Sequence, residues 1–157
     1  MFRGRTVAAA LLVVAAAGAT SGPPGVRFRS LAEGTDEALR TGKPALYFFT
    51  AAWCGPCHDL KKNVFEVGTF ARLVEEKYVP IEVVDRRRED GANAPDVEAL
   101  RVRMGVTGFP TLAIQRVDGG AAVRLVGFSS RESSLNFLRD GERRLREVEE
   151  KERRAKK

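Results

Sequence analysis

The two cysteines of this chain, Cys54 and Cys57, are separated by two residues and stand between a strand-like and a helix-like stretch. The run Ala45 to Thr50 is short, apolar and aromatic, whereas Asp59 to Phe65 has helix-forming residues with apolar side chains four apart. Cys54 is therefore expected at a helix N-terminus. Unpaired amides and the helix dipole stabilise a thiolate there, and lower cysteine pKa values from about 8.5 to roughly 3.5–7.5. Such a cysteine is a nucleophile.

Cys57, one helical turn further on, has the complementary role. When Cys54 attacks a disulfide, a mixed disulfide forms; Cys57 can then attack it, release the partner and close a Cys54–Cys57 bond. Gly55 and Pro56 shape the turn between them. A passive cross-link is the alternative, but a loop of two residues constrains the unfolded chain very little. The pair therefore predicts dithiol–disulfide exchange, with the redox-active disulfide in place of any bound cofactor or metal.

Trp53-Cys54-Gly55-Pro56-Cys57 resembles the active site of thioredoxins, and the resemblance covers roughly residues 26 to 140. A second motif, Val106 to Thr111, is similar to the loop in which a cis-proline of that family faces the cysteines. The resemblance implies that Pro110 is cis and that Phe109 offers backbone groups to a substrate strand. The sequence alone does not predict that isomer, because only about 5–6% of X-Pro bonds in folded proteins are cis.

The resemblance also implies a fold and a set of site residues. The fold is the α/β thioredoxin-like fold, a mixed central β-sheet flanked by helices on both faces. Residues 64 to 95 resemble the C-terminal periplasmic domain of the disulfide reductase DsbD and its free-standing relatives. The Gly-Pro dipeptide resembles that of reducing members, which implies a protein-disulfide reductase that another thiol protein recharges. Cys54 and Cys57 are the catalytic residues, and the substrate-binding residues are Trp53, Gly55, Pro56, Phe109 and Pro110.

The chain departs from thioredoxins next to the cysteines. The family has a buried aspartate six residues before the first cysteine and a lysine near it on the third strand. In this chain Phe48 occupies the position of the aspartate. Ile81 occupies the position of the lysine when Asp85 is aligned with the end of the third strand. Replacing both partners by apolar residues avoids stranding a buried charge. A register shifted by one residue would put Glu82 in the position of the lysine, as a substitute acid.

Composition fits one domain with a sizeable core. The net charge is +6, of which Arg3 and Arg5 supply two, and residues 142–157, with eight basic and five acidic side chains, supply three more. The remaining charge of +1 does not indicate nucleic-acid binding. We expect a monomer whose partners are protein or small-molecule disulfides and an upstream thiol donor such as a membrane disulfide reductase.

The N-terminus predicts export. Arg3 and Arg5 precede an apolar run from Val7 to Ala17, and the small residues that follow fit a signal peptide, residues 1–19, cleaved after Ala19. The protein would then be periplasmic or extracellular. An uncleaved signal would tether it to the membrane, although the run is shorter than the roughly 18–20 apolar residues that span a bilayer.

The remaining residues divide into a linker, a domain and a tail. The linker is residues 20–25, the thioredoxin-like domain residues 26–141, and a charged C-terminal helical extension residues 142–157. Within the domain we expect an edge strand at 26–29, a helix from Thr35 to Arg40, strands at 45–50 and 78–84, a helix over 95–104, a hairpin of 111–117 and 121–127, and a last helix started by a capping box at Ser129 to Glu132.

Two other functions compete for the cysteine motif. Cys54 to His58 matches Cys-x-x-Cys-His, the attachment pattern of c-type haem, with His58 and Met104 as axial ligands. A zinc site would need four ligands, and only Cys54, Cys57 and His58 cluster. A redox-inert binding domain is the other alternative.

Arg86-Arg87-Arg88 is expected in a solvated loop, with a docking patch for an acidic partner as the alternative.

Overall fold

The computed structural model describes residues 25–157, and in this range four strands form one mixed sheet. The strands are β1 (Ala45–Ala51), β2 (Val79–Asp85), β3 (Thr111–Gln115) and β4 (Ala122–Val126), in the spatial order β2-β1-β3-β4. β1 is central, parallel to β2 and antiparallel to β3, which pairs in turn with β4. All seven residues of β1 are buried, which explains its almost wholly apolar sequence.

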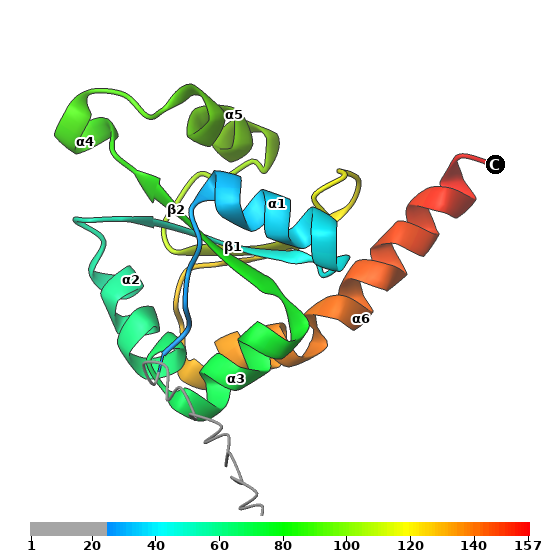
Figure 1. Ribbon diagram of the computed structural model, residues 1–157, viewed down its shortest axis with the longest axis horizontal. Coiled ribbons are helices and arrows are strands. Elements are labelled where there is room, and N and C mark those ends of the chain that lie inside the picture. The colour runs from blue at the N-terminus through cyan, green and yellow to red at the C-terminus, as the bar shows by residue number, and fades with distance from the viewer. Residues whose placement is uncertain (1–24) are drawn as a thin grey trace, which may run out of the picture.

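Helices cover both faces of this sheet (Figure 1). Helices α1 (Leu31–Thr41) and α5 (Pro95–Arg103) supply Ala38 and Leu100 to one apolar core, together with Tyr47 and Phe49 of β1. The other core lies under α2 (Gly55–Leu60), η1 (Lys61–Phe65), α3 (Gly68–Lys77) and α6 (Arg131–Ala155). Alternate residues of β1 point to opposite faces, so Phe48 belongs to this second core. The predicted fold class is confirmed.

The first helix begins earlier than predicted. Ser30, not Thr35, is its N-cap: the Ser30 side chain accepts a hydrogen bond from the backbone of Glu33, and the Glu33 carboxylate accepts one from the backbone of Ser30. Thr35 lies inside α1, where its hydroxyl donates to the Leu31 carbonyl. The predicted strand at 26–29 is also wrong, because that segment forms only one bridge, between Arg29 and Ile81.

The helix that begins at the cysteines changes its winding. It starts as the α-helix α2 and continues as the π-helical turn η1, in which Val64 and Phe65 are buried. The sequence predicted one regular helix over this range. A π-helical turn is a local insertion in the hydrogen-bond ladder, which is frequent at functional sites and has no signature in hydrophobic spacing.

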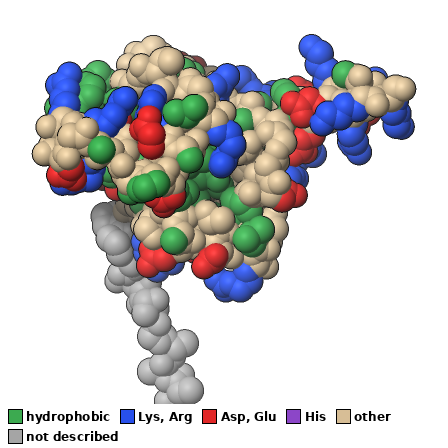
Figure 2. Space-filling view, turned by 90° about the horizontal axis from the view of Figure 1, so that it is seen from above, with side chains coloured by type: hydrophobic (Ala, Val, Ile, Leu, Met, Phe, Trp, Pro, Cys, Tyr) green, Lys and Arg blue, Asp and Glu red, His purple; other side chains and the backbone are tan. Residues whose placement is uncertain are grey.

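The last helix, α6, runs from Arg131 to Ala155 and projects beyond the sheet at its C-terminal end (Figure 1). Its N-cap is Ser130, whose hydroxyl accepts from the backbone of Ser133, so the capping box predicted at Ser129 to Glu132 is wrong and the helix has a simple serine cap one residue later. Glu150 and Arg154, four residues apart on the exposed end of this helix, form an ion pair at 2.8 Å. Figure 2 shows blue basic side chains gathered on the projecting end, whereas both signs of charge are interspersed over the visible face of the body.

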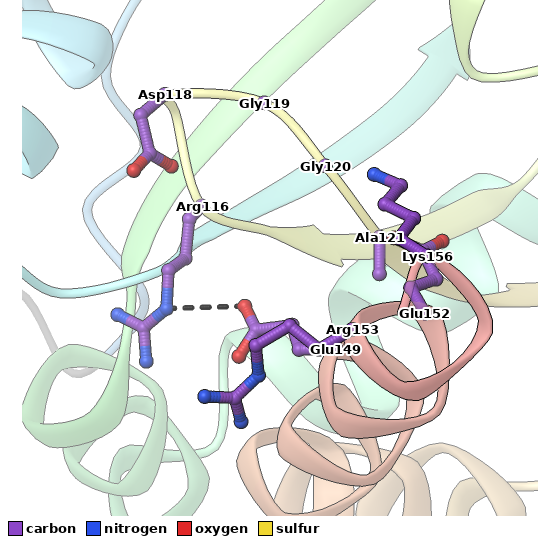
Figure 3. Close-up of a pocket in the computed structure, with 9 residues that line it drawn as sticks. All are labelled: Arg116, Asp118, Gly119, Gly120, Ala121, Glu149, Glu152, Arg153 and Lys156. Atoms are coloured by element: carbon purple, nitrogen blue, oxygen red, sulfur yellow. Dashed lines mark hydrogen bonds and ion pairs between the residues drawn. The ribbon is translucent and has the colours of Figure 1, made fainter.

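A pocket of about 370 Å³ lies between the projecting end of α6 and the β3–β4 turn (Figure 3). An ion pair between Arg116 and Glu149, with a separation of 3.2 Å between Nε and Oε1, crosses it. The turn follows the C-terminal end of β3, which is the edge of the sheet away from the cysteines, because β3 is antiparallel to β1. None of the predicted site residues lines this pocket.

The predicted signal peptide, residues 1–19, and all of the predicted linker except Gly25 lie outside the described residues. From residue 25 onward, the structure contains no helix of the length and apolarity needed to cross a membrane.

Candidate active site

Four segments meet at one edge of the sheet. The parallel strands β1 and β2 both end there, so the turn that leads to Cys54 and the segment that begins at Arg86 leave the sheet side by side. Because β3 is antiparallel, its first residue, Thr111, pairs with Phe49 near the end of β1, and Pro110 lies at the same edge. Gly127, just after β4, donates to the Pro110 carbonyl at 2.7 Å. The topology therefore brings Cys54 and Pro110 to one edge.

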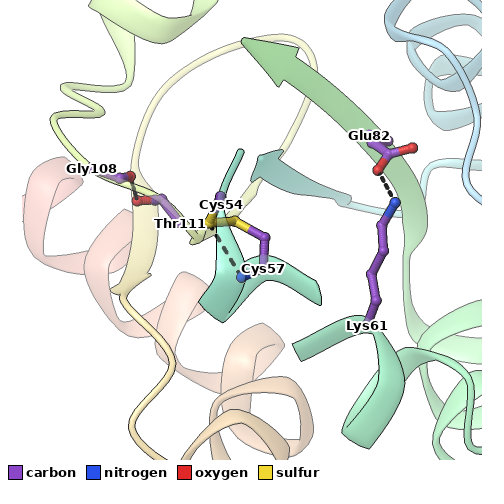
Figure 4. The surroundings of a disulfide bond; sticks show 6 residues. All are labelled: Cys54, Cys57, Lys61, Glu82, Gly108 and Thr111. Atoms are coloured by element: carbon purple, nitrogen blue, oxygen red, sulfur yellow. Dashed lines mark hydrogen bonds and ion pairs between the residues drawn. A yellow bond between two sulfur atoms is a disulfide. The ribbon is translucent and has the colours of Figure 1, made fainter. Parts of the chain in front are cut away.

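Cys54 and Cys57 form a disulfide with a Cα–Cα distance of 5.3 Å (Figure 4). Cys54 is the N-cap of α2, and its Sγ accepts a hydrogen bond from the backbone N–H of Cys57 at 3.2 Å. This N–H is one of the donors that an α-helix leaves unpaired in its first turn. The predicted helix N-terminus at Cys54 is confirmed, and the Cys54 sulfur receives an N–H dipole that would also stabilise a thiolate.

Both cysteines are buried, although residues beside them are exposed. Cys57 is 0% exposed and Cys54 3% exposed, whereas Trp53 is 44% exposed. Gly55 and Pro56 form the exposed first turn of α2, and a Cβ built on Gly55 would meet nothing within 4 Å. Both sulfurs thus pack in the second core, and the exposed residues Trp53, Gly55 and Pro56 lie directly before and after Cys54 in the chain.

The Phe109–Pro110 peptide bond is cis. Two hydrogen bonds hold the loop that contains it: the Thr111 hydroxyl donates to the Gly108 carbonyl at 2.8 Å, and the Arg101 guanidinium donates to the Val106 carbonyl at 2.9 Å. In Figure 4, Gly108 and Thr111 lie on the Cys54 side of the disulfide. The Phe109 ring makes an edge contact with the Trp53 ring, with centroids 5.9 Å apart.

A polar network connects this loop to the end of β2. The Glu98 carboxylate accepts from Arg101 and, at 2.8 Å, from the side-chain amide of Asn93, which also donates to Asp85. The hydrogen bonds from Arg101, followed by that from Asn93, lower the pKa of Glu98 to about 2. Glu98 is therefore ionised at neutral pH and fixes the arginine that holds the Val106 carbonyl.

Next to the cysteines, Phe48 pairs with Glu82 across the parallel strands, and Ile81 pairs with Tyr47. Glu82, not Ile81, is thus the cross-strand neighbour of Phe48, although β2 does end at Asp85 as the alignment assumed. The Glu82 carboxylate forms an ion pair with Lys61 at 2.5 Å, and the Lys61 ammonium is 5.8 Å from the centroid of the Phe48 ring. In Figure 4 this pair lies on the Cys57 side of the disulfide.

The ligands considered for haem are not brought together. His58 is exposed on α2, whereas Met104 is 3% exposed in the core on the other face of the sheet. Among residues 25–157, there is no cluster of three or more His, Cys, Asp or Glu side chains that could hold a metal ion.

One residue at this edge was missed by the sequence analysis. Residues Arg87–Asp90 form a short helix, α4, rather than an irregular loop, and the guanidinium carbon of Arg88 lies 3.6 Å from the centroid of the Trp53 ring. Arginine triplets on surfaces are common, and no local pattern predicts which aromatic ring, 35 positions away, one of them will contact.

Known proteins share this arrangement. The family model of the thioredoxin-like domain matches residues 31–142, more than half of the chain. The chain is 34% identical over 133 residues to the thiol:disulfide interchange protein DsbD of Ralstonia nicotianae, covering 80% of this chain and 21% of that protein. It is 35% identical over 103 residues to the protein disulfide-isomerase erp38 of Neurospora crassa, covering 66% of this chain and 26% of that protein.

The chain thus spans only about a quarter or less of the curated relatives it matches. Among solved structures, the C-terminal domain of DsbD from Neisseria meningitidis in its reduced form superposes with a TM-score of 0.52 at 26% identity. That likeness covers 69% of this chain and 90% of the domain.

Proposed function

Because the chain belongs to the thioredoxin-like family, we propose that it is a thiol–disulfide oxidoreductase that reduces protein or small-molecule disulfides through Cys54 and Cys57. The observation that carries this proposal is the Cys54–Cys57 disulfide, which joins the N-cap of α2 to its first turn at the edge where the loops converge. The two sulfurs hold the two electrons that are transferred, so the reaction needs no further cofactor.

The reaction has two exchange steps. The Cys54 thiolate attacks one sulfur of the substrate disulfide, forms a mixed disulfide and displaces the other substrate sulfur as a thiolate, which takes up a proton. Cys57 then loses its proton and attacks Cys54, which expels the second substrate thiolate and closes the Cys54–Cys57 bond. The substrate gains two electrons and two protons, and the enzyme is oxidised. A dithiol donor, such as a membrane disulfide reductase, must reduce it again.

The position of each cysteine in α2 supports these roles. Cys54 is the N-cap and follows the exposed Trp53, whereas Cys57 lies within the first turn of the helix and is 0% exposed. We assign substrate contact to Trp53, Gly55 and Pro56 on one side of Cys54, and to Phe109 and Pro110 on the other. A substrate chain passing over this edge of the sheet would contact the Trp53 and Phe109 rings, which lie side by side.

We also propose that the protein is exported. The pattern of residues 1–19 supports a signal peptide cleaved after Ala19, followed by the linker 20–25, the domain 26–141 and the extension 142–157. The continuation of α6 to Ala155 supports a helical extension. We expect a monomer in the periplasm or outside the cell, without a nucleic-acid partner. Mass spectrometry of the exported protein tests this: a mature chain that retains residue 1 would contradict cleavage.

Insulin reduction in the presence of dithiothreitol tests the activity. The wild-type protein should accelerate precipitation of the insulin B chain, and Cys54→Ser should not. A wild-type protein that leaves the rate unchanged would be a redox-inert binding domain. The potential of the pair then gives the direction: a value near the roughly −270 mV of thioredoxin supports reduction, and one near about −120 mV supports oxidation.

The two cysteine roles can be separated by trapping. Cys57→Ser should accumulate mixed disulfides with client proteins, because Cys54 can still attack and nothing within the molecule can release the client. Cys54→Ser should trap none. Dithiothreitol-sensitive adducts on Cys54→Ser alone would reverse the assignment.

A further inference from the structure

Three side chains from separate segments form a continuous stack beside Cys54. The Arg88 guanidinium lies over the face of the Trp53 ring at 3.6 Å from its centroid, and the Trp53 ring contacts Phe109 at an angle of 73°. Trp53 is 44% exposed and Arg88 is exposed, whereas Phe109 is half-buried. This Arg88–Trp53–Phe109 stack borders the approach to the disulfide and includes two of the residues assigned above to substrate contact.

The neighbours of Arg88 hold it in this position. Arg87 donates to the buried Asp85 carboxylate at 2.7 Å, and the Arg86 guanidinium binds Asp90 at 2.5 Å. The Arg86 backbone N–H also donates to the side chain of Asn93 at 2.7 Å. The segment is therefore fixed at both ends, and the charges of Arg86 and Arg87 are each matched by a carboxylate.

Arg88 itself is not matched. Within residues 25–157 it forms no ion pair, although Glu89 is its neighbour in sequence and Asp90 lies two residues away, engaged by Arg86. Stacking occupies only the face of a guanidinium, so the N–H groups at its edge remain able to donate two parallel hydrogen bonds to a carboxylate. The planar group is also preorganised by the ring beneath it, which lowers the cost of ordering it on binding.

We propose that Arg88 selects substrates, so that this protein preferentially reduces disulfides that carry an acidic residue beside the cysteine that Cys54 attacks. This inference rests on the proposed function. The carboxylate binds the edge of the Arg88 guanidinium while the substrate backbone passes over Trp53 toward Cys54. Because the pair forms at an exposed rim, we expect a preference of about fivefold, which decreases as salt concentration rises.

Three synthetic peptides test the proposal. They contain the same internal disulfide and differ only in having Glu, Gln or Lys beside the attacked cysteine. With the full-length protein, kcat/KM should be about fivefold higher for the Glu peptide than for the Gln peptide, and lowest for the Lys peptide. Arg88→Gln should abolish this order, so that the three peptides react at similar rates, and Arg88→Glu should reverse it. Arg72→Gln, which removes an exposed arginine of α3, is the control and should keep the wild-type order.

The outcomes separate the two proposals. Equal rates for the three peptides with the wild-type protein, or an unchanged preference in Arg88→Gln, would overturn the selectivity while leaving the oxidoreductase function intact. A loss of rate in Arg88→Gln that is the same for all three peptides would mean that Arg88 only supports Trp53, and would also overturn it. If the wild-type protein reduces none of the peptides and does not reduce insulin, both proposals fail.

Discussion

Replacing Phe48 by aspartate tests how the enclosed Cys57 loses its proton. Phe48 is fully buried, and its ring centroid is 5.6 Å from that of Phe28 and 5.3 Å from that of Phe65. A buried thiol resists ionisation because desolvation disfavours its charged form, so the resolving step should be slow at neutral pH. A carboxylate at this position could accept the proton. We expect Phe48→Asp to accelerate the attack of Cys57 on the mixed disulfide about tenfold. This is less than the rate enhancement of about 10²–10⁴ that general acid–base groups supply in natural active sites.

The same substitution should destabilise the fold. Truncating a buried phenylalanine costs about 3–5 kcal/mol, and an incompletely bonded polar group adds about 1–3 kcal/mol. Lys61, whose ammonium is 5.8 Å from the Phe48 ring, would offset part of that addition by turning from Glu82 to the new acid. The expected loss is therefore about 5 kcal/mol, which is close to the whole stability of a marginal domain. Circular dichroism must establish that the variant is folded, and Phe48→Leu is the control without an acid.

The assay follows the release of a chromophoric thiol from a mixed disulfide at Cys54, by stopped-flow absorbance across the neutral pH range. A folded Phe48→Asp with the wild-type rate and pH profile would refute the reasoning, because another group would already transfer the proton. Glu82→Gln identifies that group independently of Phe48: it should slow resolution if Glu82 accepts the proton. Glu76→Gln, an exposed glutamate of α3, is its control, and Asp59 is the next residue to change.

Three further substitutions test the scaffold. Glu98→Gln should lower the thermal midpoint of unfolding at neutral pH. Arg101 and Asn93 lower the pKa of Glu98 in the folded protein to about 2, so the stability that ionised Glu98 contributes is complete above its ordinary pKa and is lost as the pH falls toward 2. The thermal midpoints of the wild-type protein and the variant should therefore converge in acid. Gly141→Ala would place a Cβ 2.2 Å from Cδ1 of Ile114. The resulting overpacking should cost about 1–3 kcal/mol, more than the gain of about 1 kcal/mol from the higher helix propensity of alanine, so a urea titration should show a lower free energy of unfolding. Ser30→Ala removes a helix cap and should cost about 1 kcal/mol in the same titration.

The sequence predicted those features that depend on local pattern. The apolar run that forms β1, the helix start at Cys54 and the hairpin of β3 and β4 each depend on neighbouring residues, and all three are confirmed. The prediction of Thr35 as the cap overlooked Ser30, which forms a capping box with Glu33 three residues later, a pattern that is visible in the sequence. The predicted strand at 26–29 failed for a different reason. Arg29 turns its side chain to Glu37 and Glu75 from two helices, and local alternation cannot reveal such partners.

The candidate site was predicted less completely than the fold. Its cysteines follow from spacing, and the loop around Pro110 follows from resemblance, because no short-range pattern connects two segments so far apart. The position of Glu82 beside Phe48 required the register of β1 and β2, which periodicity leaves uncertain by one residue. The contact between Arg88 and Trp53 depends on how the whole segment after β2 folds back.

The order of pairing in the sheet has a consequence for how the protein acquires its activity during synthesis. Ala45 of the central strand pairs with Val79 and with Gln115, so β1 cannot complete its ladders until the chain has been made as far as β3. Pairings between such distant residues form slowly, and a nascent chain presents its N-terminal part first. Cys54 and Cys57, by contrast, are only three positions apart and can meet within one turn. In an unfinished chain, Cys54 and Cys57 can therefore form their disulfide before the loop that contains Pro110 has been made. The cysteines can react before the residues that we assign to substrate binding are in place.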